Sequence, residues 1–461
     1  MAKRGCDVTV LEQGSQIGGC LQCFRRGGAL FETGMHYVGS CDPGQTLHTF
    51  FHRLGISDSV ALSRLNPMAY DVVSFRGVEY PIANGREHFV NALADHFPDS
   101  RGDLYRYYDL CKQVAASFPI HSQNKDADLA LAAEYQTKSV NAVIDSVVSD
   151  PLLRQVLVGM LPLYAGEKDH TPFTTHALIT DFYDQSAFRL VGGSDRIARA
   201  LANQIHEHGG RVLTRRKACR IECDRSQATA VVTASGEVFV ADLIISTIHP
   251  TRTMQLIDSH ILRPTYRRRI MNIRNTTAAF TLYLKFRKNS VRYMDHNLYY
   301  YCGDDVWGCQ DYTAESWPRY LLYMHGCHEE NPFYAETGEI ITYMSFNEVQ
   351  RWQGTHVGRR GQDYEDFKRA RAERLISVLE RAVPGISANI ESYYTSTPLT
   401  YLDYTGVPEG SMYGAAKDVE APGTGSISCK TIIPNLLLAG QSITLHGMLG
   451  VLAGSMITCS E

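Results

Sequence analysis

The alternation of apolar and polar positions marks two helix-to-strand units far apart in the chain. Near the start, Ala2 to Gly5 has the pattern of a last helical turn stopped by glycine, and Cys6 to Glu12 alternates as a short strand that ends in an acid. In the second unit Ser194 is a candidate helix cap, apolar residues recur on one helical stripe, and Gly209-Gly210 precedes a strand at 211–214. Two such units predict an α/β protein with a Rossmann-like layer.

The rest of the chain shows other spacings of apolar residues. Residues 47–145 are mostly helical in pattern, with a hairpin whose turn is Arg76-Gly77. β-branched residues dominate 229–246, and tyrosines alternate with other residues between 276 and 413, which predicts a sheet with an aromatic face. Spacing alone leaves open whether that face is core or the wall of an apolar tunnel. The chain ends in an apolar strand, a polar turn and a glycine-punctuated helix.

Composition narrows the classes of function. The chain has 461 residues, 44% of them hydrophobic and 20% charged, with a net charge of -4, so we expect a two-domain globular protein that does not bind nucleic acid. No apolar run is long enough to span a bilayer. The 12 cysteines are scattered and no export signal is evident, so we expect a reducing, cytoplasmic setting, with peripheral membrane contact at most.

The acid that ends the first strand is a candidate nucleotide ligand. In a βαβ dinucleotide fold such an acid binds the adenosine ribose and follows a glycine-rich loop by about 20 residues. Counting back from Glu12 leaves no room for a G-x-G-x-x-G loop, so we expect that about 20 to 30 residues with the first strand precede this start. The alternative is an ordinary solvated acid.

Glycines and histidines gather in two further segments. Gly18-Gly19 and Gly34 expose backbone to a phosphate or a flat ring. The helix after Gly440 to Gly447 has no acid in its first turn and suits an anionic ring, although close helix packing also explains its glycines. His36 and His446 lie in these segments as either structural or catalytic residues.

Cys20 and Cys23 form a lone C-x-x-C, which is either coincidental or a redox pair. We predict no metal site, because neither a second cysteine pair nor a neighbouring pair of histidines accompanies it.

Taken together, motifs at both ends of the chain resemble the phytoene desaturase-like flavoproteins, and within them the retinol saturase and carotenoid isomerase branch. The motifs are Val10-Leu11-Glu12, Ile17-Gly18-Gly19, Phe31 to Tyr37, Leu438-Ala439-Gly440-Gln441 and His446 to Val451. The resemblance implies an FAD/NAD(P)-binding Rossmann-like domain of the amine oxidase type, here lacking its first strand, and a second α+β substrate domain on a mixed sheet. It places the FAD domain at 1–75, 186–255 and 425–461, and the substrate domain at 80–185 and 256–424.

The resemblance also assigns residues to the cofactor FAD. Glu12 and Gln13 would hold the adenosine ribose, Gly18 and Gly19 the pyrophosphate, and Thr33, Gly34, Met35 and His36 the isoalloxazine. Cys219 would meet the adenine through its backbone, and Gly440, Gln441, Gly450 and Val451 the ribityl chain and pyrimidine end. Cys20 and Cys219 depart from the arginine and valine usual in the family, without disturbing backbone contacts. The missing glycine-rich loop puts tight FAD binding in doubt.

The activity implied is an FAD-dependent oxidoreductase acting on a carbon–carbon double bond of an isoprenoid lipid, by saturation, desaturation or isomerisation. His36 and His446 are the candidate catalytic residues, and NAD(P) is a candidate electron donor. The alternatives are a flavin amine oxidase, which requires an aromatic cage and a lysine near the flavin N5, and a non-catalytic remnant without the phosphate loop.

Overall fold

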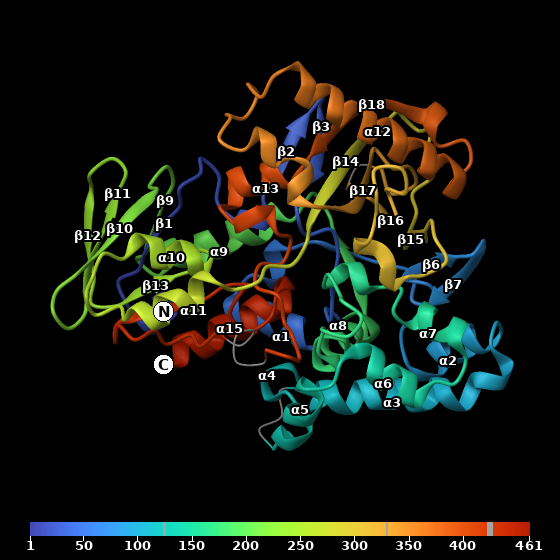
Figure 1. Cartoon of the computed structure of the whole chain (residues 1–461), viewed down its shortest axis with the longest axis horizontal. Helices are drawn as coiled ribbons and strands as arrows, with labels where there is room; N and C mark the ends of the chain where they lie inside the picture. The colour runs from blue at the N-terminus through green and yellow to red at the C-terminus, as the bar shows by residue number, and fades with distance from the viewer. Residues whose placement is uncertain (123–125, 329–330, 422–426) are drawn as a thin grey trace.

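The computed structural model describes residues 1–122, 126–328, 331–421 and 427–461. Several short sheets and the two chain ends lie at the left of Figure 1, and one large sheet with most of the helices lies at the right. The ends lie side by side, because the Arg4 guanidinium donates a hydrogen bond of 2.9 Å to the Cys459 carbonyl. The predicted α/β class with a mixed second sheet is confirmed.

Two parallel strand pairs lie in the left half. β1 (Thr9–Leu11) pairs with β9 (Arg211–Leu213), and β13 (Ile244–Ser246) pairs with β19 (Leu436–Leu438). Each pair joins segments distant in sequence, so strands from the first, middle and last parts of the chain share this half. Among the described residues, each pair is a separate two-stranded sheet.

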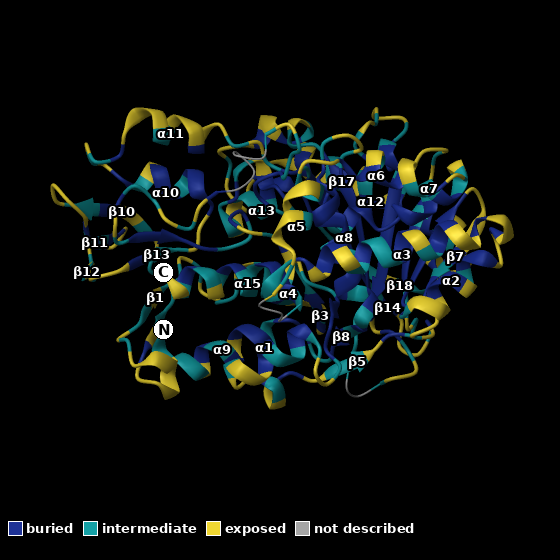
Figure 2. Cartoon of the chain, turned by 90° about the horizontal axis from the view of Figure 1, so that it is seen from below, coloured by how far each residue is buried: buried dark blue, intermediate teal, exposed yellow. Residues whose placement is uncertain are grey.

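The remaining short strands form three small antiparallel sheets among the described residues. Their strands are β10 (Ala218–Cys223), β11 (Ala228–Thr233) and β12 (Val238–Val240); β4 (Val38–Gly39), β8 (Ala187–Leu190) and β5 (Leu62–Arg64); and the hairpin of β2 (Cys23–Arg26) and β3 (Ala29–Glu32). Helices α1 (Thr46–Leu54), α9 (Asp195–Glu207), α10 (Pro250–Leu256), α11 (Pro264–Met271) and α15 (Gly447–Ser460) accompany them. Figure 2 shows that α11 keeps a largely exposed face.

The large sheet has seven strands in the order β18-β14-β17-β16-β15-β6-β7. Only β15 and β6 run parallel to each other, so the sheet is mixed. The predicted hairpin at Arg76-Gly77 is present as β6–β7. The strands are β6 (Asp71–Phe75), β7 (Val78–Ile82), β14 (Ala278–Phe286), β15 (Asn297–Tyr301), β16 (Tyr320–His325), β17 (Thr337–Met344) and β18 (Ile390–Ser396).

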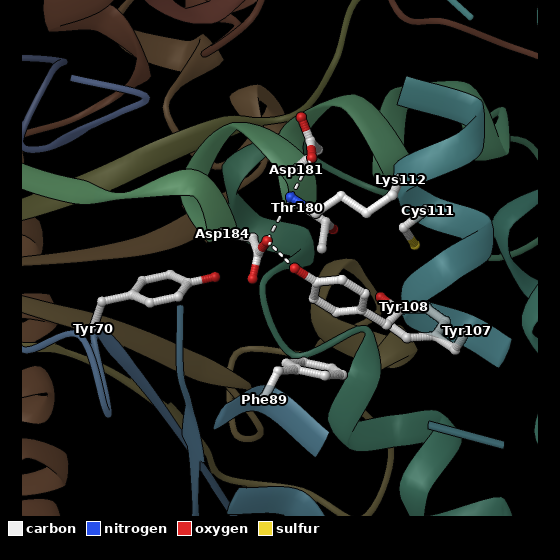
Figure 3. A pocket seen from close by; sticks show the side chains of 9 residues that line it. All are labelled: Tyr70, Phe89, Tyr107, Tyr108, Cys111, Lys112, Thr180, Asp181 and Asp184. Atoms are coloured by element: carbon white, nitrogen blue, oxygen red, sulfur yellow. Dashed lines mark hydrogen bonds and ion pairs between the residues drawn. The ribbon is translucent and has the colours of Figure 1, made fainter. Parts of the chain in front are cut away.

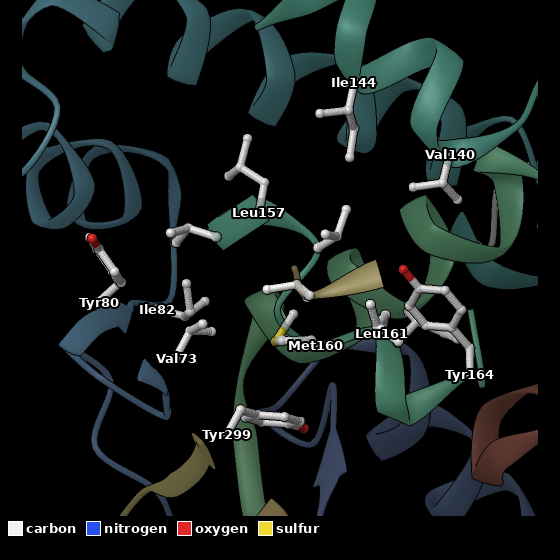
Figure 4. Close-up of a cluster of buried hydrophobic side chains, with 14 of the residues drawn as sticks. Val73, Tyr80, Ile82, Val140, Ile144, Leu157, Met160, Leu161, Tyr164 and Tyr299 are labelled. Carbon is white, nitrogen blue, oxygen red and sulfur yellow. The ribbon is translucent and has the colours of Figure 1, made fainter. Parts of the chain in front are cut away.

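Both faces of this sheet are covered, which explains why its central strands are buried along their whole length. One face packs against α12 (Gln362–Ala382) and α13 (Pro398–Thr405). The other face carries Tyr299, Tyr301, Tyr320 and Tyr343 and packs against helices of the 86–185 segment, as Figure 4 shows for part of this core. In this structure the predicted aromatic face is therefore buried core.

The helical layer over that face is formed by α2 (Arg86–Ala94), α3 (Arg101–Ala116), α4 (Pro119–Ser122), α5 (Leu129–Gln136), α6 (Val140–Val147), α7 (Pro151–Leu157) and α8 (Phe173–Gln185). Where α3 meets α8, the Lys112 ammonium lies 2.5 Å from Asp181 and 2.6 Å from Asp184 (Figure 3). The cavity beside these side chains has a volume of about 10 Å³, which suits one water molecule rather than a substrate. The cluster therefore joins two helices.

Two sequence predictions need correction. The first strand is shorter than predicted and spans Thr9–Leu11. Ser194 occupies the N-cap of α9 but makes no capping bond, because its hydroxyl donates instead to the Leu21 carbonyl at 3.1 Å. Residues 71–75 lie in the large sheet, although the predicted FAD segment ran to 75. The boundary predicted at 424/425 lies outside the described residues. The division into domains as a whole stays a prediction.

Among the described helices, none combines the length and the apolar character needed to cross a bilayer.

Candidate active site

Glu12 and Gln13 follow the carboxyl end of β1. The Glu12 carboxylate accepts a hydrogen bond of 2.6 Å from the Gly14 amide, which turns the chain sharply after the strand. The backbone of the following segment is tied to the strand after α9, since the amides of Arg215 and Arg216 donate to the carbonyls of Gly14 and Glu12. The Glu12 carboxylate therefore lies at the end of β1, where the segment after β1 is hydrogen-bonded to the segment after β9.

Cys219 follows that second segment in β10. It lies at a register shift between Ala218 and Arg220, and its side chain is exposed, with Sγ 3.3 Å from the Val232 carbonyl. A bulge of this kind interrupts the regular ladder and suits a backbone contact with a ligand. The adenine contact predicted for Cys219 stays a prediction.

Gly18 and Gly19 lead into a 3-10 turn, η2 (Gly19–Leu21), with positive φ at both positions. A Cβ at Gly18 would lie 2.9 Å from the Ala198 Cβ of α9, so only glycine lets the loop approach that helix. At Gly19 a Cβ would meet no atom within 4 Å. Gly18 therefore allows the loop to pack against α9, and Gly19 leaves open space beside its backbone.

The segment Thr33 to Met35 connects three parts of the molecule. The Thr33 hydroxyl donates to the Gln22 carbonyl at 2.7 Å, and the Thr33 carbonyl accepts from the Tyr401 hydroxyl of α13 at 3.1 Å. A Cβ at Gly34 would lie 3.1 Å from the Cys20 Cβ. Met35 packs in one apolar cluster with Leu449 of α15. The predicted N-terminal and C-terminal site segments are thus brought into one neighbourhood.

His36 lies in a buried polar cluster with two glutamates. Its Nδ1 is 2.5 Å from the Glu339 Oε2 of β17 and 3.9 Å from the Glu32 Oε2 of β3. The first contact has an ion-pair distance without regular hydrogen-bond angles, and both nitrogens of His36 and the Glu32 Oε1 are buried without a hydrogen-bond partner among the described residues. Burial, together with the neighbouring Glu339, raises the pKa of Glu32 well above its ordinary value.

His446 precedes α15 and is buried in a different way. Its ring packs on Tyr413 with centroids 4.3 Å apart, and its Nε2 lies 3.0 Å from the Leu163 carbonyl, to which the N–H donates. Burial lowers the pKa of His446 to about 4, so the imidazole is neutral at pH 7. Its Nδ1 is then a proton acceptor.

The turn between β19 and α15 carries the remaining predicted residues. Gly440 has a φ of 108°, and a Cβ there would lie 3.1 Å from the Thr247 carbonyl oxygen. Gln441 follows it. Within α15, a Cβ at Gly450 would lie 2.5 Å from the Leu445 carbonyl oxygen, so the glycine lets the turn fold back onto the helix, while Val451 follows half-buried. Contacts of these residues with a cofactor stay predictions.

Sequence reasoning missed several residues of this neighbourhood. Glu339 had a visible signal, because it is the one acid in the otherwise uncharged strand Thr337–Met344. Tyr401 and Tyr413 were seen only as members of a tyrosine-rich region. Lys417 gave no periodic signal, yet its ammonium donates to the Ile443 carbonyl at 3.1 Å, and burial lowers its pKa to about 8.

A second hollow lies away from this neighbourhood. It has a volume of about 360 Å³ and is lined by polar and charged side chains of α10, the segment after α11 and the loop at 408–409, among them Arg252, Arg274 and Glu409. Arg274 is paired with Glu167 and Asp418. None of the predicted site residues lines this hollow.

Known proteins resemble this chain over almost its whole length. Residues 1–455 match the profile of the flavin containing amine oxidoreductases. The chain is 28% identical to the all-trans-retinol 13,14-reductase of Rattus norvegicus, with 100% of this chain and 82% of that protein aligned. It is 22% identical to the lycopene-forming phytoene desaturase of a Paracoccus species, over 89% of this chain and 82% of that protein.

Solved structures share the fold. An oxidoreductase from Methanosarcina mazei superposes with a TM-score of 0.64 at 16% identity, covering 100% of this chain and 96% of that one. The resemblance inferred from the two ends of the sequence is thereby confirmed.

Proposed function

The chain belongs to the flavin containing amine oxidoreductase family and is therefore a flavin-dependent oxidoreductase, and from this premise we propose that it acts on a carbon–carbon double bond of an isoprenoid lipid. The observation that carries the proposal is the surroundings of His446. Tyr413, which packs on its ring, also packs against the apolar core that contains Tyr299, Tyr320 and Tyr343. The ring of Tyr413 is only partly buried, and an aromatic face of this kind stacks well on a flat polyene.

The residues present fit an FAD. Glu12 offers a carboxylate at a strand end for the ribose, and Gly19 leaves backbone facing open space for the pyrophosphate. The nitrogens of His36 are buried without a hydrogen-bond partner among the described residues, as expected for groups that face a cofactor or substrate. The first turn of α15 has no acid, which favours a ring that becomes negative when reduced.

When bound, the flavin supplies hydride transfer, which side chains cannot perform. The protein's own part is placement and proton handling. Thr33 is fixed by Gln22 and Tyr401, so the segment that leads to His36 is held from two sides. His446, neutral and anchored through Nε2, keeps its Nδ1 as an acceptor, and its burial excludes water from that part of the site. We propose NAD(P)H or a redox protein as the electron donor.

The test is a single-turnover reaction. The flavoprotein is reduced anaerobically and mixed with all-trans-retinol or a carotenoid, and flavin reoxidation is followed together with the mass of the lipid. We expect a product two hydrogens heavier, or a geometric isomer at unchanged mass. His36→Gln should retain flavin and lose turnover. Flavin that binds normally in the wild type but reacts with no polyene would contradict the proposal.

Amine oxidation is the second candidate, and Lys417 is the observation that favours it. A buried lysine with its pKa lowered to about 8 beside the Gly440–Gly447 turn is the kind of residue that amine oxidases require near the flavin. The assay for this candidate therefore starts from the oxidised flavoprotein, which is mixed anaerobically with polyamines. Reduction of the flavin by an amine, lost in Lys417→Met, would favour this candidate over the first.

A further inference from the structure

The cluster of Glu32, His36 and Glu339 places two carboxyl groups and an imidazole together away from water. The His36 side chain is 9% exposed and that of Glu339 is 5% exposed. Two buried carboxylates repel each other, so the cluster requires a compensating charge. The Arg189 guanidinium donates to the carbonyls of Met294 and His296 and to the Asn297 side chain, and so its polar contacts are directed elsewhere.

Glu339 is held in place through one oxygen and faces His36 with the other. Its Oε1 accepts a hydrogen bond of 2.9 Å from the Glu32 amide at the end of β3. Its Oε2 lies 2.5 Å from the His36 Nδ1. β17 lies between β14 and β16 in the large sheet, so the carboxylate is carried by a rigid element. The side chain therefore joins the sheet to the segment that precedes the candidate catalytic residue.

The cluster has residue types that also bind metal ions, and the separation of Nδ1 and Oε2 bears on that alternative. Two neighbouring ligands bound to one ion at about 2.1 Å lie about 3.0 Å apart in octahedral geometry and about 3.4 Å apart in tetrahedral geometry. The His36 Nδ1 faces the Glu339 Oε2 at 2.5 Å without the angles of a regular hydrogen bond, and a carboxylate at that position favours a proton on Nδ1. A proton on Nδ1 leaves Nε2 as the nitrogen that exchanges protons with another group.

We propose that Glu339 is a positioning residue that fixes His36 with a proton on Nδ1, so that Nε2 exchanges a proton with a carbon atom of the substrate. This inference rests on the proposed reaction at a carbon–carbon double bond. In saturation the π bond breaks, and one carbon receives a hydride from the reduced flavin, which is oxidised. The neighbouring carbon receives a proton from Nε2 of the doubly protonated ring, that N–H bond breaks, and His36 is left neutral with its proton on Nδ1. Desaturation reverses each of these transfers.

Other titratable groups near the cluster must be considered in any pH measurement. Glu32 keeps its proton more readily than an ordinary carboxyl group. The groups that act on the two glutamates from the surrounding elements are Arg189 of β8, Cys23 of β2, Cys327, Tyr283 of β14 and Tyr401 of α13. Cys23, Tyr283 and Tyr401 are neutral near pH 7, since burial raises the pKa of each.

The test reads the tautomer of His36 directly. In protein labelled with ¹⁵N-histidine, the His36 signals are identified by their absence in His36→Gln. We expect Nδ1–H in the wild type. In Glu339→Gln an amide replaces the carboxylate and donates to Nδ1, so the proton should move to Nε2. Glu336→Gln, the same change close by on an exposed side chain, should leave the His36 signals in place.

Activity provides the second readout. Glu339→Gln should lower kcat by about 10²- to 10⁴-fold, the usual range for general acid–base catalysis, with flavin absorbance and KM close to those of the wild type. A wild-type His36 whose only ring proton lies on Nε2, or His36 signals unchanged in Glu339→Gln, would overturn the inference. So would stoichiometric divalent metal in the purified protein that disappears in Glu339→Gln. If the tautomers behave as expected while the wild type converts no polyene, the positioning role stands and the proposed function fails.

Discussion

At the scale of single residues, the buried acids carry the strongest physical signals. Asp71 opens β6 at full burial, where the Asn297 amide donates to one oxygen at 2.8 Å and the Tyr37 hydroxyl to the other at 3.1 Å. Burial raises the pKa of Asp71 to about 7, although the two hydrogen bonds act to lower it. The folded protein therefore binds this proton more tightly than the unfolded chain does.

We predict that Asp71 makes stability fall as the pH rises. A carboxyl group whose pKa is raised on folding stabilises the protein fully below its unfolded pKa, and this contribution is lost as the pH rises towards about 7. Each pKa unit corresponds to about 1.4 kcal/mol. The Tm of the wild type should decline between about pH 4 and pH 7, and Asp71→Asn should flatten that decline. Asp58→Asn, on the surface, is the control, and an equal slope in wild type and Asp71→Asn would contradict the prediction.

What the sequence predicts at this scale depends on local pattern. Glu12, Gly18 and Gly34 stand out because acid and glycine interrupt apolar runs, and the structure places each at a turn or close approach. Glu339 and Tyr401 reach the neighbourhood of His36 from segments more than 300 residues away. Such contacts depend on the register of the sheet strands and on how the helices pack. The spacing of apolar residues along the sequence does not predict either of these.

At the scale of elements, strand and helix positions follow the periodicity, whereas their ends do not. The helix at 447–460 and the β6–β7 hairpin lie where the pattern places them. The Ser194 hydroxyl, by contrast, meets a loop carbonyl instead of capping its helix, because tertiary packing offers it a partner that the local sequence does not show.

The close approach at Gly450 predicts a loss of flavin. In Gly450→Ala the new Cβ would lie 2.5 Å from the Leu445 carbonyl oxygen, so the Gly440–Gly447 turn must move away from α15. We expect the affinity for FAD to fall by about tenfold or more, which is about 1.4 kcal/mol, as measured by the flavin-to-protein absorbance ratio during titration. Gly102→Ala, at a helical glycine with only an ordinary contact at 3.6 Å, is the matched control. Full flavin content in Gly450→Ala would separate this turn from the cofactor.

The exposed helix α5 predicts a membrane contact. It has no buried residue, and its Leu129 is 63% exposed although the helix is rich in alanine and leucine. An enzyme that takes up an insoluble lipid requires an apolar entrance, and we propose that α5 provides it. Wild-type protein should float with liposomes, and Leu129→Glu should lower the bound fraction several-fold, because burying a leucine contributes about 1.5–3 kcal/mol. Val240→Glu, on the equally exposed β12, should float normally; equal losses in both variants would leave α5 without a special role.

At the scale of the whole molecule, the two halves differ in how their strands are joined. The large sheet has seven strands in one continuous ladder with a core on each face, and its register follows from long apolar and aromatic runs. In the other half, β1–β9 and β13–β19 are two separate pairs whose strands come from the beginning, middle and end of the chain. The sequence predicts each short strand, but their assembly depends on contacts between distant segments.

This difference predicts where FAD stabilises the protein. A ligand that binds only the folded state adds about 2.7 kcal/mol at 100 times its Kd, and this gain appears at the elements that the ligand holds together. If Glu12 and the Gly440–Gly447 turn bind opposite ends of the cofactor, the amides of β1, β9, β13 and β19 should exchange with deuterium about 100-fold more slowly when FAD is added. Exchange in β14, β16 and β17 should hardly change, because these strands are already covered on both faces. Glu12→Ala should reduce the protection at β1 and β9 before it affects β13 and β19, since its carboxylate lies at the end of the first pair. Slower exchange confined to the seven-stranded sheet would place the cofactor in the other half of the molecule.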